Sequence, residues 1–174
     1  MATAERFPHA PPLQTARLSL EPLWLDHADE MAPLLADPRL HEFTGGDPPT
    51  LEYLRESYHE RLSAPRAGGP WWCNWVVRHR DSGLAVGGMQ AEVARADDGW
   101  VAEIAWILGY EHQGRGYARE AAEAMIAWLR AEGVRELVGD IHARNEPSMR
   151  LARALGLAPT DEPAEHEGDV RWRG

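Results

Sequence analysis

The chain has 174 residues, 44% of them hydrophobic, which suits a single globular domain and excludes a globally disordered chain. Its 28 acidic residues outnumber its 18 lysines and arginines for a net charge of −10, which argues against nucleic acid as a partner and favours a cationic substrate, although high solubility alone would also explain the charge. The single cysteine excludes an internal disulfide, and the sequence contains no metal-binding motif. It also contains no signal peptide and no apolar run long enough to span a membrane. We therefore expect a cytoplasmic protein with no metal and no membrane partner.

The first third of the chain predicts one strand and two helices after a loose start. Residues 1–12 are rich in Pro and Ala and are expected to form an irregular lead-in. Residues 13–20 alternate well enough for a strand. Asp26 would cap a helix that continues to about residue 36, and Thr50 would cap a second helix that ends near residue 62.

The middle of the chain predicts three strands in succession. Residues 72–80 and 84–93 are separated by Asp81-Ser82-Gly83, which has the chemistry of a hairpin turn. A turn at residues 96–99 then leads to a third strand at 100–108. Because strands joined by such short turns pair with their neighbours, we expect an antiparallel meander.

The last third predicts the longest helix and a helix–strand tail. Residues 115–132 carry a continuous apolar stripe, and Gly133 is well placed to end that helix. A strand follows at 134–141, and Asn145 would cap a short helix before a tail with room for two more strands. The order of strands and helices along the whole chain predicts an α+β, or mixed α/β, fold in one domain over residues 1–174.

The run Gln113-Gly114-Arg115-Gly116-Tyr117-Ala118 is the most informative motif, because it joins a predicted strand to the longest helix. Backbone N–H groups at a helix start lack internal partners, and glycine lets an anion approach them closely. No Gly-Lys-Ser/Thr follows, so the run is not a Walker A loop, and it lacks the Gly-x-Gly-x-x-Gly of dinucleotide-binding folds.

This run resembles the Q/R-x-x-G-x-G/A motif of the GNAT N-acetyltransferase superfamily, and its surroundings look like the RimJ/RimL branch, named for ribosomal-protein acetyltransferases. The segment Leu13-x-Thr-x-Arg-Leu-x-Leu20 is similar to the opening strand of that branch, and residues 145–156 are similar to the motif after its fifth strand. The resemblance spans residues 13–157. It implies a GNAT-like central sheet that is mostly antiparallel and splayed, with helices on its flanks.

The resemblance also implies acetyl-coenzyme A as co-substrate. In the family, the strand before the glycines splays from its neighbour and pairs with the pantetheine arm, while the loop amides hold the pyrophosphate. Asn145 is equally a helix cap, and Arg150 equally a solvated surface arginine. The implied coenzyme contacts are Trp106, Ile107 and Leu108 in the strand, Gln113, Gly114, Arg115, Gly116, Tyr117 and Ala118 in the loop, and Asn145, Ser148 and Arg150 beyond the fifth strand.

The reaction implied by the resemblance is direct attack of a neutral amine on the thioester, which needs a base and a donor to the oxyanion or thiolate. Glu103 is the one charge in an apolar strand and is the first candidate base, with Glu92 on the preceding strand as the second; a solvent-facing structural role is the alternative for Glu103. Many family members carry a tyrosine acid after the Asn motif. This chain has none there, which leaves Ser148 as a weak substitute.

The acceptor is not fixed by the resemblance. Trp71 and Trp72 are candidates for its pocket walls, with a place in the core as the alternative. We expect either a protein N-terminus or a small-molecule amine as acceptor, and a homodimer is a family expectation. The alternative function is a catalytically inactive module that binds acyl-coenzyme A as a regulatory ligand.

Overall fold

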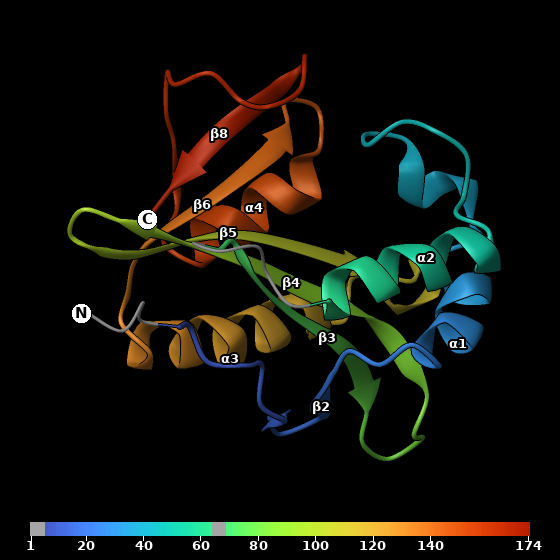
Figure 1. Ribbon diagram of the computed structural model, residues 1–174. Coiled ribbons are helices and arrows are strands. Elements are labelled where there is room, and N and C mark those ends of the chain that lie inside the picture. Colours follow the sequence, from blue (N-terminus) through green and yellow to red (C-terminus); the bar gives the residue numbers. More distant parts are fainter. Residues whose placement is uncertain (1–5, 64–68) are drawn as a thin grey trace.

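The computed structural model describes residues 6–63 and 69–174, whose strands form one sheet with helices on both faces (Figure 1). The strand order is β1-β2-β3-β4-β5-β6-β8-β7, and every neighbouring pair is antiparallel except β5 and β6. The predicted mixed α/β fold with a mostly antiparallel sheet is therefore confirmed. The strands are β1 (Leu13–Gln14), β2 (Leu18–Pro22), β3 (Trp71–His79), β4 (Ala85–Ala96), β5 (Gly99–Leu108), β6 (Val134–His142), β7 (Ala158–Pro159) and β8 (Asp169–Arg173), and the helices are α1 (His27–Leu34), α2 (Leu51–Leu62), α3 (Tyr117–Ala131) and α4 (Glu146–Ala154), with 3₁₀ turns η1 (Pro38–His41) and η2 (Tyr110–His112).

The centre of the sheet is the meander β3–β4–β5, as the three predicted strands and their short turns indicated. Its side chains alternate between the two faces, so Cys73, Trp75 and Val77 pack toward α3 while Val76 packs toward α1 and α2. Pairing across the meander lines up Asn74, Gln90 and Ala105 in one row on the α1/α2 face.

The sheet splays between β5 and β6. The parallel pairing covers only the first part of β5 and ends where Glu103 lies opposite Val138. Beyond that point β5 stays on β4 through Leu108, whereas β6 pairs on its other side with β8. Residues 104–108 of β5 therefore keep one edge that has no strand partner within the described part of the chain, as the resemblance implied.

Two hydrophobic cores lie on the two faces of the sheet. The larger one packs the apolar stripe of α3 and the inner side of α4 against the meander and β6. The smaller one packs α1 and α2 against the opposite face. The helices thus cover the meander but leave the splayed half of β5 open between them (Figure 1).

The ends of the helices follow local sequence signals in most cases. The hydroxyl of Thr50 accepts from the N–H of Tyr53 at the start of α2, and Gly133 takes the left-handed conformation (φ +91°) after α3. Asp26 precedes α1 but makes no capping hydrogen bond with its side chain, and α1 ends at Leu34, two residues earlier than predicted.

Residues 6–12 form neither helix nor strand, as expected for the lead-in, but they are packed against the core and not loose; residues 1–5 lie outside the described residues. Phe7 is 1% exposed and packs edge-on against the rings of Trp100 and Trp128. The indole N–H of Trp75 donates to the carbonyl of Pro11 (2.7 Å). Long-range aromatic packing, which leaves no local signal, anchors this segment. No helix among the described residues has the length and apolarity to cross a membrane.

Candidate functional site

The glycine loop, residues 113–118, lies at the end of β5 and at the start of α3. Gly114 and Gly116 both adopt positive φ values (+73° and +79°), which other residues rarely do. No side chain caps α3, and the N–H groups of residues 114–118 have no acceptor within the described residues. A row of unpaired, outward-facing N–H groups at the positive end of a helix is suited to binding an anion.

Gln113 links the glycine loop to the end of β5 through hydrogen bonds. Its backbone N–H donates to the carbonyl of Tyr110, and its side-chain amide donates to the carbonyl of Leu108. The structure therefore gives Gln113 an internal role, while the other amides of the loop stay available.

The turn between β1 and β2 holds the loop from the other side through Glu120 in the first turn of α3. One carboxylate oxygen of Glu120 accepts from the Thr15 hydroxyl (2.6 Å) and the Arg17 N–H (2.8 Å), and the other accepts from the Arg17 guanidinium (2.7 Å). The same guanidinium donates to the carbonyl of Arg115 (2.9 Å). Burial acts to raise the pKa of Glu120, but these hydrogen bonds outweigh it and leave the pKa below its ordinary value.

The first of two pockets, the cleft pocket, opens where β5 and β6 diverge and has a volume of about 470 Å³. Phe43 and His142 stack with ring centroids 5.5 Å apart and form part of its wall. Trp106, Asn145 and Ser148 also line it, so three of the predicted coenzyme contacts gather in one hollow although 42 residues separate Trp106 from Ser148.

These three residues are linked by hydrogen bonds through the backbone N–H and the hydroxyl of Ser148. The side-chain oxygen of Asn145 accepts from the N–H of Ser148, which confirms the predicted cap of α4. The indole N–H of Trp106 donates to the hydroxyl oxygen of Ser148 (3.3 Å). Because that oxygen accepts the indole hydrogen, the hydroxyl's own hydrogen remains free to be donated toward the cleft pocket.

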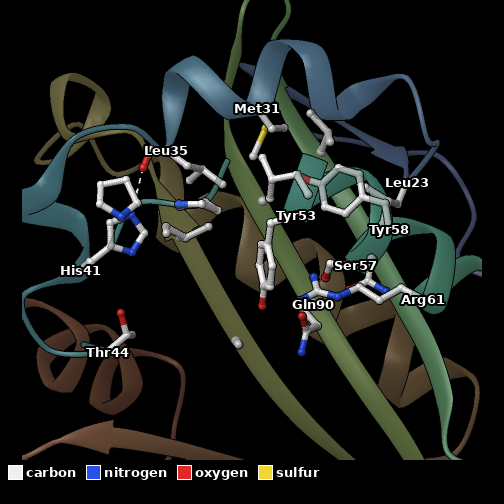
Figure 2. Close-up of a pocket in the computed structure, with 18 of the residues that line it drawn as sticks. Leu23, Met31, Leu35, His41, Thr44, Tyr53, Ser57, Tyr58, Arg61 and Gln90 are labelled. Carbon is white, nitrogen blue, oxygen red and sulfur yellow. Dashed lines mark hydrogen bonds between the residues drawn. The ribbon is translucent and has the colours of Figure 1, made fainter. Parts of the chain in front are cut away.

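The second pocket, the helix pocket, has a volume of about 770 Å³ and lies between α1, α2 and the η1–α2 loop on one side and β3, β4 and β5 on the other (Figure 2). This volume is in the range of small-molecule sites. The two pockets share four residues, so they meet at the splayed part of β5. The shared residues are Thr44, Gly45, Ala105 and Trp106.

Several polar side chains of the helix pocket carry no signal in the sequence that marks them as functional. They include Asn74 and Gln90 in the row that ends at Ala105, and Arg61 from α2. His41 also lines the pocket, and its Nε2 is hydrogen-bonded to the carbonyl of Leu35 (2.9 Å), as the dashed line in Figure 2 marks. That bond makes Nε2 the protonated nitrogen, which leaves Nδ1 as an acceptor.

The two candidate bases face each other across β4 and β5. Glu92 pairs directly with Glu103, and both lie on the face that carries the helix pocket, although neither belongs to the lining of either pocket. Desolvation, followed by the negative charge of Asp140, raises the pKa of Glu103. Desolvation also raises the pKa of Glu92, with a smaller contribution from Glu165. Glu103 stands one strand repeat, about 7 Å, from Ala105 at the junction of the pockets.

The tryptophans predicted as acceptor walls lie on opposite faces of β3. Trp71 faces the α3 core, where its ring packs edge-on against Trp100 (5.1 Å), so its placement does not support a role in the acceptor site. Trp72 lies on the pocket face, with the guanidinium of Arg61 5.8 Å from its ring, but outside the pocket lining. Cys73 is buried in the core, as expected, and burial raises the pKa of its thiol to about 12.

The remaining predicted coenzyme residues divide by exposure. Ile107 lines the helix pocket and Leu108 is buried beneath the strand edge. Arg115 and Arg150 are exposed, and their side chains have no ion pair or hydrogen bond among the described residues, so both guanidinium groups are available to an anion. No cluster of three or more His, Cys, Asp or Glu side chains in the described ranges is arranged to hold a metal ion.

Comparison with known proteins agrees with this geometry. Residues 17–158 match the model of the acetyltransferase (GNAT) domain. The chain is 26% identical over 129 residues to the uncharacterized N-acetyltransferase YjdG of Bacillus subtilis. The aligned region covers 71% of this chain and 74% of that protein. An acetyltransferase from Agrobacterium tumefaciens has the same fold (TM-score 0.73, 24% identity, 98% and 97% of the two chains). So does RimL, a ribosomal L7/L12 alpha-N-protein acetyltransferase solved with coenzyme A (TM-score 0.75, 15% identity, 94% and 97%).

Proposed function

This chain belongs to the acetyltransferase (GNAT) domain family, and we propose that it transfers an acetyl group from acetyl-coenzyme A to a primary amine by direct attack. The observation that carries the proposal is the junction of the two pockets at Ala105 and Trp106, on the open edge of β5 that leads to the glycine loop. Acetyl-coenzyme A bound along this edge would bring its thioester to the junction of the two pockets. An acceptor in the helix pocket could place its amine at the same junction.

The coenzyme would use the unpaired groups of the splayed region. Its pyrophosphate would lie on the free N–H groups of residues 114–118, with Arg115 adding charge, and its pantetheine amides would pair with the open edge of β5 from Trp106 to Leu108. Asn145, Ser148 and Arg150 would border the arm from α4. RimL, which shares the fold, is described in complex with coenzyme A, which supports coenzyme A as the ligand.

The chemistry would run in one displacement. The lone pair of the neutral amine attacks the thioester carbonyl, the C–S bond breaks, and the amide forms as the thiolate leaves. Glu103 would accept the ammonium proton through water, because its raised pKa makes it a better base than a glutamate with an ordinary pKa, although its side chain is exposed, and Glu92 opposite it is the second candidate. The free hydrogen of the Ser148 hydroxyl would be donated to the departing thiolate.

A thiol-release assay with acetyl-coenzyme A and a panel of primary amines tests the proposal, with calorimetry of coenzyme A binding run beside it. We expect tight coenzyme binding and amine-dependent thiol release. Tight binding with no turnover on any amine would instead support the regulatory module that binds acyl-coenzyme A, and no binding would overturn both.

The acceptor remains either a protein N-terminus or a small-molecule amine in this proposal. RimL acts on a protein α-amino group according to its description, which favours the first. The volume of the helix pocket, about 770 Å³, favours the second.

A further inference from the structure

The helix pocket contains a positive charge that forms no ion pair among the described residues, although one carboxylate, Asp47, also lines the pocket. Arg61 lines the pocket from α2, and no acidic group lies within ion-pair distance of it among the described residues. In contrast, Arg55, one and a half turns earlier on the same helix, pairs with Asp29 (2.9 Å) outside the pocket. A partly buried guanidinium without a counter-ion, in a protein of net charge −10, is an electrostatic match for an anionic ligand group.

Hydrogen-bonding side chains surround Arg61. Ser57 lies one turn before it on the same face of α2, and Figure 2 shows the guanidinium directed into the pocket with Ser57 and Gln90 beside it. The hydroxyl and the carboxamide add donors to the five of the guanidinium. Donors of this kind around one cation form a typical carboxylate site.

Asn74 supplies a second, independent indication that the pocket is built for a ligand. It is only 7% exposed and lines the pocket, yet its side-chain oxygen has no hydrogen-bond partner within the described residues. A buried amide oxygen without a hydrogen bond destabilises the folded protein, and because this oxygen is an acceptor, a donor group of the ligand would satisfy it. Asn74 lies directly opposite Gln90 on the neighbouring strand, so one ligand could contact both carboxamides.

The rest of the lining is mostly apolar. Leu23, Met31, Leu54 and Tyr58 come from the small core beneath α1 and α2 and enclose the space beside the polar group. Tyr53 also reaches into the pocket in Figure 2. A ligand here would therefore have an apolar body.

The sheet sets the distance between the polar group and the reaction site. Gln90 is one strand away from Ala105, where the pockets meet, and Asn74 is two strands away. One strand spacing is about 5 Å. An anionic group on Arg61 and Gln90 would therefore lie about one strand spacing from an amine at Ala105.

We propose that the acceptor of this enzyme is an amino-carboxylate of amino-acid size, with its carboxylate on Arg61 and Gln90 and an apolar side chain in the helix pocket. The inference rests on the proposed acetyl transfer and names its substrate class. It also revises what the bulk charge indicates, because the acidic surface favours cations at long range while the pocket itself presents a guanidinium. A protein N-terminus has no carboxylate at this spacing unless its first residues are acidic.

The test compares three matched amines: phenylalanine, phenylalanine amide and phenethylamine, which differ only at the carboxylate. With wild-type protein and acetyl-coenzyme A, we expect kcat/KM for phenylalanine to exceed the other two by about 100-fold. Arg61→Gln should abolish that preference, mainly through KM, and leave the Kd for coenzyme A unchanged. Arg61→Lys should recover part of it, and Arg55→Gln is the matched control that should behave as wild type.

Binding measurements keep this inference separate from the proposed function. If no amine is acetylated, calorimetry with phenylalanine in the presence of coenzyme A still tests it, since Arg61→Gln should weaken that binding by the same factor. Equal use of all three amines by the wild type, or an equal loss on all three in Arg61→Gln, would overturn the inference and leave acetyl transfer intact.

Asn74→Leu provides a second readout. Replacing an unsatisfied amide with an apolar group of similar size is expected to leave Tm unchanged or raise it. At the same time it should weaken phenylalanine binding more than coenzyme binding. A lower Tm with unchanged phenylalanine binding would make Asn74 a structural residue only and remove it from the site.

Discussion

Arg17 and Glu120 lie 2.7 Å apart, although 103 residues separate them in the chain. This ion pair joins the turn after β1 to the first turn of α3, and the same guanidinium also holds the carbonyl of Arg115 inside the glycine loop. The residue that fixes the peptide between Arg115 and Gly116 therefore comes from the opposite end of the sequence. We therefore propose Arg17 as a positioning residue for the glycine loop.

Replacing Arg17 by Lys keeps the positive charge. The single ammonium group of lysine cannot donate to Glu120 and to the Arg115 carbonyl in the geometry of the guanidinium. We expect the Kd for coenzyme A to rise about 10-fold, which corresponds to the loss of about one hydrogen bond. Calorimetry measures the change. Arg55→Lys breaks a comparable exposed pair away from the loop and should leave the Kd unaltered.

Gly116→Ala tests whether the loop backbone approaches the coenzyme. Gly116 has a φ of +79°, and an added Cβ would lie 3.4 Å from the Arg17 guanidinium. Gly83 has a similar φ of +72° with open space around it, in the turn between β3 and β4. Both alanines should lower the free energy of unfolding by about 1 to 3 kcal/mol. Only Gly116→Ala should also weaken coenzyme binding, and equal affinities would count against the phosphate site.

Glu103→Gln tests the base. The base acts only when it is ionised, so kcat/KM should fall as the pH decreases through the pKa of Glu103. Because this pKa is raised above its ordinary value of 4.5, the acidic limb of the pH–rate profile should lie above pH 4.5. The amide should lower kcat/KM by about 100-fold and remove this limb, with little change in the Kd for coenzyme A.

Glu92→Gln, on the facing strand, is the control for Glu103. If the limb survives in Glu103→Gln and disappears in Glu92→Gln, the roles are exchanged. A limb that survives in both variants would exclude both glutamates as the base.

Asp140 should contribute to stability in a pH-dependent way. The bidentate hydrogen bonds from Arg171 (2.8 and 2.9 Å) hold its pKa below the ordinary value of 3.8. Since the folded state favours the ionised form, the stabilisation is complete above about pH 4 and is lost as the pH falls through the lower, folded-state pKa.

Asp140→Asn should therefore lower the free energy of unfolding at pH 7 by about 1 to 3 kcal/mol, and by less at pH 3. Urea unfolding at the two pH values measures this. Asp29→Asn breaks the exposed pair with Arg55 and should change stability by less than about 1 kcal/mol at either pH. A difference for Asp140→Asn that does not depend on pH would show that its hydrogen bonds, and not its charge, matter.

Local signals in the sequence were sufficient for most elements and for the position of the glycine loop. Thr50 and Asn145 cap their helices as predicted, and the short turns of the meander fixed the order of three strands. The strand–glycine–helix pattern located the loop because the anion binding proposed for it needs only backbone N–H groups of consecutive residues.

Features made by long-range packing had no such signal. The anchoring of Phe7 and the pairing of Thr15 with Glu120 depend on segments more than ninety residues apart. Arg61 reaches the helix pocket only because α2 crosses β3 and β4. The case of Trp71 and Trp72 was accessible to reasoning, since consecutive residues of a strand point to opposite faces and could not both line one pocket.

The splay of β5 from β6 also has a cost for the free protein. A strand edge with unpaired N–H and C=O groups is a template for any extended segment, including the same edge of a second molecule. Here the stretch without a strand partner is only residues 104–108 among the described residues, and Glu103 places a charge next to it. If the coenzyme covers this edge, it would act as a protective strand for the folded chain as well as a donor. Concentrated protein without coenzyme would then self-associate more readily than the complex.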